Sequence, residues 1–187
     1  MKRIIWLIPF LILAGCTPRE QSLMPLKVGQ TWTYEIKPGF QSDAIEVKVS
    51  RPLSVGPCQG YELTSGYGST RLGWDGNTLL ASQLGGTVYD PPLPLISPLG
   101  PEETKTWRGD VVLAGKTREG IARLSRKDVK TKVGTFDRNA VESIINLEVD
   151  GQKHEILTWF VKNLGIVRQE QRRDGILVNR ISYLSGP

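Results

Sequence analysis

The sequence predicts an all-β fold, and two patterns carry this prediction. Short alternations of apolar and polar residues recur along the chain; within residues 31–36, Trp32, Tyr34 and Ile36 share one face. Glycine and proline separate these segments, and a period of two residues is typical of a strand with one buried face. No segment shows a convincing 3.6-residue apolar stripe. We therefore expect about ten antiparallel strands in a curved sheet, forming a half-barrel or an open barrel.

The first half of the chain contains five predicted strands and then an interruption. The alternation places the strands near residues 31–36, 45–49, 59–65, 69–74 and 78–84. Residues 91–101 hold five prolines, and proline lacks the N–H group that a central strand donates. We expect an exposed loop or a polyproline-like crossing here, whose apolar residues cover an open face or rim of the sheet: Leu93, Leu95, Ile96 and Leu99.

The final third predicts a four-strand meander over residues 139–149, 153–161, 165–172 and 176–184. Asp150-Gly151 and Asp174-Gly175 each supply a tight hairpin turn, because Asp-Gly accepts the positive φ angles that such turns require. Residues 116–132 carry seven basic and two acidic side chains. We expect this segment to be a solvated strand face, with contact to anionic lipid headgroups as the alternative.

The first fifteen residues have the features of a secretory signal. Lys2 and Arg3 precede ten uncharged residues, and Ala14 and Gly15 then offer small side chains just before Cys16. The apolar run is shorter than the roughly 20 residues that a membrane-spanning helix needs. We therefore expect the segment to be removed from the mature protein.

The sequence "LAGC" at residues 13–16 resembles the lipobox of bacterial lipoproteins. This resemblance implies that the Cys16 thiol carries a diacylglyceryl group and that the signal is cut before Cys16. Two or three acyl chains anchor a protein durably, whereas a single chain binds only marginally. The implied location is the extracytoplasmic side of a membrane in the cell envelope, the outer membrane if the cell has one. The alternative is an ordinary secreted protein with an incidental cysteine.

These boundaries predict a signal peptide at residues 1–15, a lipidated tether at 16–25 and a single β domain at 26–187. After cleavage, 22 basic side chains remain against 19 acidic ones, which is too mild an excess to indicate nucleic-acid binding. Cys58 is then an unpaired thiol, and no neighbouring residue is of a kind that lowers a thiol pKa. We expect it to be inert.

Two further motifs resemble a group of uncharacterised, mostly-β bacterial lipoproteins. That group has a Gly-x-x-Trp-x-Tyr first strand and a late aromatic strand followed by Leu-Gly-Ile-Val-Arg. The matching residues here are Gly29, Trp32, Tyr34, Trp159, Phe160, Leu164, Gly165, Ile166, Val167 and Arg168. The resemblance implies a curved antiparallel sheet, distantly similar to the half-barrels that carry lipoproteins between envelope membranes. Those carriers have helices that plug a hydrophobic cavity, and this sequence predicts none.

The residue types that support catalysis or metal binding are sparse. His154 is the single histidine, so zinc sites that use two or three imidazoles are excluded, and no Gly-x-Ser-x-Gly motif is present. We therefore expect no catalytic residues, no metal and no cofactor. Core packing explains the tryptophans, and the alternative is an aromatic-lined, ligand-binding cradle that includes Trp32, Tyr34 and Trp159.

The leading expectation is a non-enzymatic, membrane-anchored envelope lipoprotein that binds a protein partner or an amphiphilic ligand on a curved sheet. An envelope hydrolase is the first alternative, with a site assembled from distant residues of perturbed pKa. A structural assembly subunit is the second, with a closed core and a flat apolar patch.

Overall fold

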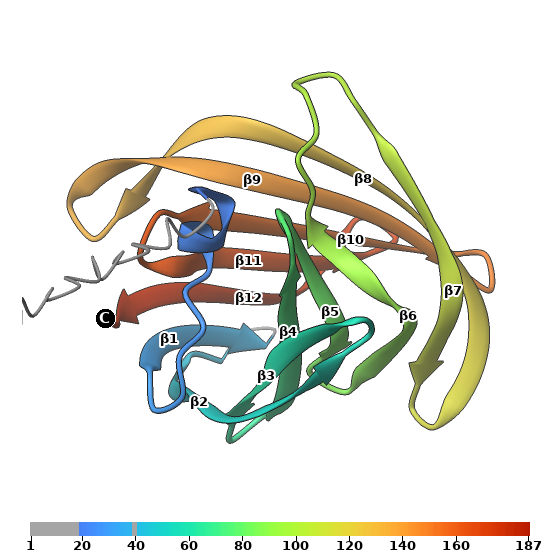
Figure 1. Cartoon of the computed structure of the whole chain (residues 1–187), viewed down its shortest axis with the longest axis horizontal. Coiled ribbons are helices and arrows are strands. Elements are labelled where there is room, and N and C mark those ends of the chain that lie inside the picture. The colour runs from blue at the N-terminus through green and yellow to red at the C-terminus, as the bar shows by residue number, and fades with distance from the viewer. Residues whose placement is uncertain (1–18, 39–40) are drawn as a thin grey trace, which may run out of the picture.

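The computed structural model describes residues 19–38 and 41–187, which form an antiparallel β-barrel with one short 3-10 helix (Figure 1). Among these residues the elements are η1 Arg19–Leu23, β1 Thr31–Pro38, β2 Asp43–Val55, β3 Cys58–Ser65, β4 Gly68–Asp75, β5 Thr78–Leu84, β6 Thr87–Ile96, β7 Lys105–Leu113, β8 Lys116–Val133, β9 Phe136–Val149, β10 Gln152–Val161, β11 Gly165–Arg173 and β12 Ile176–Ser185. No helix in this part of the chain has the length and hydropathy needed to span a bilayer.

The sheet closes because β1 pairs with β2 on one side and with β12 on the other. Every other strand pairs with its neighbours in the chain, so the topology is an up-and-down meander. At the closing seam Tyr34 lies opposite Tyr183, and the two rings meet edge to face with centroids 6.3 Å apart. The predicted antiparallel all-β fold is confirmed. The described residues hold twelve strands rather than about ten, and the wall is closed rather than open.

The four-strand meander at the C-terminal end is confirmed to within a few residues as β9 to β12. Both Asp-Gly turns have the expected backbone, with φ of 50° and 73° at Asp150 and Gly151 and of 50° and 81° at Asp174 and Gly175. Two successive positive φ angles match the twist of the flanking strands, and this match fixes the hairpin register.

The proline-rich segment differs in part from the prediction, because residues 91–96 belong to strand β6, whereas residues 97–101 lie outside any strand as expected. β6 pairs with β7 only over residues 88–90, and its register with β5 omits residues 89–92, so Pro91 and Pro92 lie where neither neighbouring strand is paired with them. On the other side β6 pairs with β5 through an interrupted register. The expected covering role of its apolar residues is found at Leu93, Leu95 and Ile96, which are buried.

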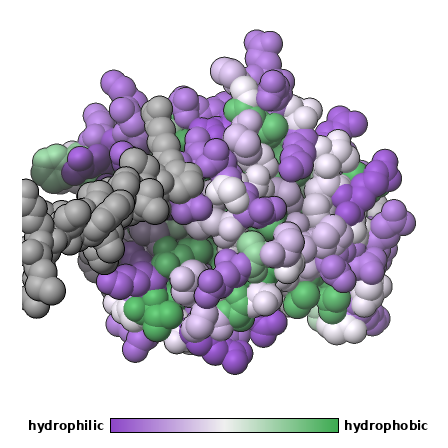
Figure 2. Space-filling view, in the orientation of Figure 1, coloured by the Kyte–Doolittle hydropathy of each residue, from purple (hydrophilic) through white to green (hydrophobic). Residues whose placement is uncertain are grey.

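Inward-facing side chains fill the barrel. The largest fully buried ones are Trp32, Phe160, Met24, Leu72, Leu79, Leu93, Leu95, Ile96, Ile145, Val49, Val55 and Val111. Alternation along each strand explains the filling, since residues two apart point to the same side of the wall. The exterior is more polar, and Figure 2 shows mainly hydrophilic side chains along β8 and β9 at the upper edge of the molecule.

The two ends of the barrel differ, and η1 lies across one of them (Figure 1). We call this the covered end. Gln21 donates to Gly76 O at 3.3 Å in the β4–β5 turn, and Asn163 N donates to Ser22 O at 2.6 Å in the β10–β11 turn. The far end carries the β3–β4, β5–β6, β7–β8, β9–β10 and β11–β12 turns.

The packed part of the chain begins before Leu26, within the segment expected to be a tether. Leu23 and Met24 are buried at the covered end, and Trp74 Nε1 donates to Met24 O at 3.0 Å. The segment is therefore held by its side chains and its backbone together. The predicted signal peptide at residues 1–15, and Cys16 with it, lie outside the described residues.

Candidate functional site

The two quoted motifs, from the first strand and from the β10–β11 region, meet at the covered end. Trp32 Nε1 donates to Leu164 O at 2.6 Å. Gly165 has a φ of +88°, and a Cβ at this residue would lie 3.1 Å from Met24 Sδ and 3.3 Å from Trp32 Nε1. Glycine is therefore required here both for its backbone conformation and for the close approach of the turn. Trp32 and the turn at Leu164 and Gly165 thus form a closely packed floor beneath η1.

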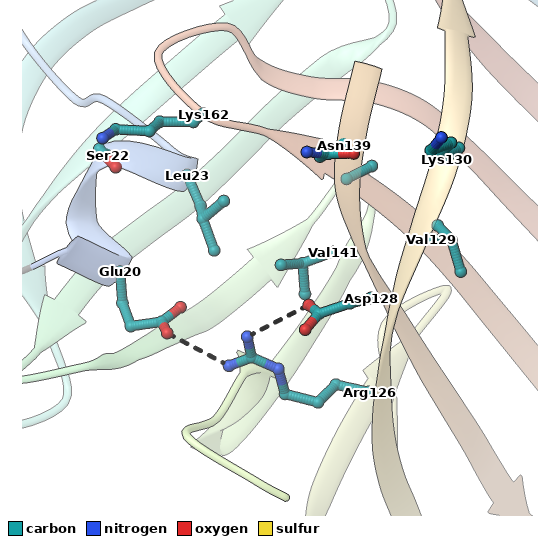
Figure 3. Close-up of a pocket in the computed structure, with 11 residues that line it drawn as sticks. Glu20, Ser22, Leu23, Arg126, Asp128, Val129, Lys130, Asn139, Val141 and Lys162 are labelled. Atoms are coloured by element: carbon teal, nitrogen blue, oxygen red, sulfur yellow. Dashed lines mark ion pairs between the residues drawn. The ribbon is translucent and has the colours of Figure 1, made fainter. Parts of the chain in front are cut away.

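Beside this floor lies a cleft of about 790 Å³ between η1 and the β8–β9 hairpin (Figure 3). We call it the η1 cleft. Its lining residues are Glu20, Ser22, Leu23, Arg126, Asp128, Val129, Lys130, Asn139, Ala140, Val141 and Lys162. Ligand pockets typically occupy about 300–1,000 Å³, so the η1 cleft has the size of a small-molecule or headgroup site.

Arg126 forms the polar centre of the η1 cleft. Its guanidinium donates to Ser97 O at 3.2 Å and lies 3.4 Å from a Glu20 carboxylate oxygen and 3.9 Å from Asp128 (Figure 3). The Arg126 and Glu20 side chains are 16% and 21% exposed, so this pair is better shielded from water than an ordinary surface ion pair. Arg126 thereby connects η1 to β8 and to the segment after β6.

The remaining lining is amphiphilic. Leu23 and Val141 supply buried apolar surface, whereas Lys130 and Lys162 are exposed cations. Glu20 Oε2 is buried and accepts no hydrogen bond from the described residues. The η1 cleft therefore offers an apolar wall and two cations, a combination that suits an amphiphile with a phosphate-bearing headgroup.

The far end holds a smaller cavity of about 90 Å³ just inside the barrel mouth. Its lining is mostly apolar, including Tyr89 and Val149, together with His154 and Gln171. Burial and the nearby Arg173 lower the pKa of His154, while Asp174 partly opposes them. This cavity is below the usual size of a ligand pocket.

A third hollow of about 690 Å³ lies on the outer surface of β7 to β10. Charged side chains of both signs line it, among them Arg108, Arg123, Glu148 and Lys153.

Next to this hollow, Glu170 contacts both Arg168 and Arg172. Burial raises the pKa of Glu170, but the hydrogen bonds and charges of the two arginines outweigh it and leave the pKa lowered.

The structure does not bring together the three aromatic residues that the sequence suggests for ligand binding. Trp32 and Tyr34 are buried in the main core, where burial raises the pKa of the Tyr34 hydroxyl. Trp159 lies on the outer face of the wall, where the Arg168 guanidinium stacks over its ring at 4.9 Å. No described groove is lined by all three.

The described residues offer neither a metal-binding cluster nor a reactive thiol. The described residues contain no group of three or more histidine, cysteine or acidic side chains that could hold a metal ion. The Cys58 thiol donates to Val55 O at 3.1 Å, and burial and Asp75 raise its pKa. A raised pKa keeps the sulfur protonated and poorly nucleophilic.

Sequence reasoning did not identify Glu20 or Arg126 as partners. Glu20 lies in the segment expected to be a tether, and Arg126 lies in the basic segment expected to be a solvated face. The signal that points to Arg126 is the inward alternation of Ala122, Leu124 and Arg126, which places a charge on the buried face of β8.

No protein-family model matches the chain, and comparison with curated proteins finds no match. Among solved structures, the fold is similar to that of a candidate lipoprotein from Parabacteroides distasonis, with a TM-score of 0.53 and 13% identity over 88% of this chain and 98% of that one. A candidate exported protein with a YmcC-like fold from Bacteroides fragilis has a TM-score of 0.48 and 14% identity over the same shares. At such identities the first likeness establishes the fold of this chain as one also found in a candidate lipoprotein.

Proposed function

We propose that this protein is a lipid-anchored, non-enzymatic lipoprotein of the bacterial cell envelope that binds an amphiphilic ligand in the η1 cleft. The observation that carries the ligand proposal is the position of this cleft. It lies against η1, which begins three residues after Cys16. Three residues span at most about 11 Å, so a lipid on Cys16 holds the cleft close to the membrane.

The anchor itself is supported by the lipobox-like "LAGC" sequence and by the fold shared with a candidate lipoprotein. The extracytoplasmic face of a membrane follows from such an anchor. The test is metabolic labelling with a palmitate analogue followed by membrane flotation. We expect the native protein to be labelled and to float with membranes, and the Cys16→Ala variant to lose both properties. A variant that stays membrane-bound would contradict the anchor.

The composition of the η1 cleft supports the ligand class. Lys130 and Lys162 can contact a phosphate, and Leu23 and Val141 can contact the first carbons of an acyl chain. The single histidine lies outside the η1 cleft, since His154 lines the cavity at the opposite end of the barrel.

Native mass spectrometry of the protein extracted from its own membrane tests the ligand. Two variants on the same strand locate the ligand, because Asn139 lines the η1 cleft and Asn146 lines the outer hollow, and both are exposed. We expect a lipid-sized adduct on the native protein and on Asn146→Trp, and its loss in Asn139→Trp. The reverse pattern would move the ligand to the outer hollow, and the absence of any adduct would refute ligand binding.

A further inference from the structure

The β8–β9 hairpin projects beyond the barrel wall at the covered end. β8 pairs with β7 over residues 116–124, and β9 pairs with β10 over residues 140–149. The four outermost pairs of the hairpin run from Lys130 and Asn139 to Val133 and Phe136, and no other described strand pairs with them. At about 3.3 Å per residue these four pairs extend roughly 13 Å. We call residues 130–139 the hairpin tip.

The hairpin tip combines an exposed aromatic ring with an excess of cations. Phe136 is 66% exposed, and the Arg138 guanidinium lies 5.8 Å from the centre of its ring. Lys130 and Lys132 are also exposed, and Asp137 is the one acidic residue in this segment. Figure 2 shows a hydrophobic group projecting among hydrophilic ones at this corner of the molecule.

The hairpin tip lies at the same end of the molecule as η1 and the C-terminus (Figure 1). The ion pair between Glu20 and Arg126 fixes η1 to the base of the hairpin. The two halves of the basic segment 116–132 therefore lie at opposite ends of the barrel. Residues 116–119 lie at the far end beside the β7–β8 turn, whereas Lys130 and Lys132 lie at the covered end.

We propose that the hairpin tip docks on an anionic membrane surface, with Phe136 entering the headgroup region and Lys130, Lys132 and Arg138 contacting lipid phosphates. This inference rests on the membrane anchor in the proposed function, because the anchor holds the tip within reach of the bilayer. Aromatic residues flanked by cations are typical of segments that lie in a membrane interface. We therefore infer that the partner of the hairpin tip is lipid, because the cations match lipid phosphates and the Phe136 ring matches the headgroup region and the upper acyl carbons.

Docking at a second point would orient the molecule. An anchor at Cys16 alone leaves the barrel free to tilt relative to the bilayer. A second contact at the hairpin tip holds the region between the anchor and the tip against the bilayer. That space is the η1 cleft, which η1 and the hairpin line from its two sides. A lipid ligand would then pass between the bilayer and the cleft without crossing open water.

The test uses the full lipidated chain in vesicles of phosphatidylglycerol and phosphatidylcholine, in a Cys58→Ser background. An environment-sensitive fluorophore is attached at Phe136→Cys, and a control protein carries it at Ile176→Cys. Ile176 is apolar and 71% exposed, so it is comparable to Phe136 in exposure, but it lies at the far end of the barrel. Lipids with a nitroxide group near the headgroup then report contact. We expect loss of most of the emission from residue 136 and none from residue 176.

Replacing the three cations by glutamine separates the charge contribution. Each cation near an anionic surface contributes about a fivefold preference, so the Lys130→Gln, Lys132→Gln, Arg138→Gln variant should shift the docking equilibrium by on the order of 100-fold. Its quenching at residue 136 should fall to that of residue 176. Two results would overturn the proposal. One is equal quenching at residues 136 and 176 when the three cations are present, and the other is quenching at residue 136 that stays the same after the three substitutions.

Flotation of the same vesicles keeps the two proposals distinguishable. Failure of the anchor appears as protein that does not float, whatever the fluorophore reports. Failure of docking appears as protein that floats while residue 136 stays unquenched. Vesicles of pure phosphatidylcholine complete the test, since docking should weaken there as it does in the glutamine variant.

Discussion

The covered end and the far end of the barrel are built from the same kind of strands, yet they carry different features. At the covered end a short helix, two indole hydrogen bonds and a glycine turn produce a closed floor with an amphiphilic cleft of about 790 Å³ beside it. At the far end hairpin turns surround a cavity of about 90 Å³, and Leu113, Ile176, Leu177 and Val178 are exposed on strands that reach this end.

This difference shows where specificity can arise in an up-and-down barrel. The wall follows a repeating pattern in which every strand pairs with its neighbours in the chain, so it leaves little room for a specific site. The ends are built from turns and terminal segments, which vary without disturbing the strand ladder. Here one end carries a helix and an extended hairpin, and a cleft of about 790 Å³ lies between them.

The largest expected effect concerns packing at the two ends. Trp32→Ala removes a fully buried ring and its hydrogen bond to Leu164 O, so we expect a loss of about 3–5 kcal/mol in the free energy of unfolding. Ile176→Ala, at the far end, should change that free energy by less than about 0.5 kcal/mol. Denaturant unfolding at constant m-value measures both. Similar costs at the two positions would show that the ends do not differ in packing.

A smaller effect concerns the ion pairs of the two ends. Arg126→Ala leaves the shielded Glu20 carboxylate without its ion-pair partner and Ser97 O without its donor, so we expect a cost of about 1–3 kcal/mol. The matched change at the far end is Arg118→Ala, which breaks a more exposed pair with Asp150 and should cost less than about 1 kcal/mol.

A double-mutant cycle with Glu20→Gln refines the measurement at the covered end. If Glu20 and Arg126 interact directly, the two substitutions together should cost less than the sum of their separate costs. Strict additivity would mean that Arg126 acts through Ser97 alone. The cycle also reports whether η1 depends on this pair for its attachment to the hairpin.

The smallest expected effect is the pH dependence that His154 adds at the far end. Its pKa is lowered in the folded protein, so the unfolded chain binds the proton more tightly. The contribution of His154 to stability is therefore present above the ordinary histidine pKa of about 6.5 and is lost as pH falls through the folded pKa. His154→Gln should remove this part of the pH dependence. Titration of the imidazole by NMR checks it, and a folded pKa above 6.5 would reverse the sign.

Much of the barrel wall follows from local sequence. Period-two alternation identifies β1 and the last four strands, and the Asp-Gly pairs identify their turns, because both depend on residues that are close in the chain. The same local reasoning failed at β6. Pro91 and Pro92 are tolerated because neither β5 nor β7 pairs with them, and strand neighbours are a property of the whole sheet.

The sequence by itself determined the all-β class, the antiparallel meander of the last four strands and the tight turns at Asp150-Gly151 and Asp174-Gly175. The sequence also predicts that Cys16 carries a lipid, and this remains a prediction. The tertiary structure alone decided that β1 joins β12 to close the barrel, that Trp32 and Trp159 lie on opposite faces of the wall, and that Glu20 meets Arg126. The physical reason is range: propensity and periodicity act over a few residues, whereas closure and the η1 cleft depend on contacts between residues far apart in the chain.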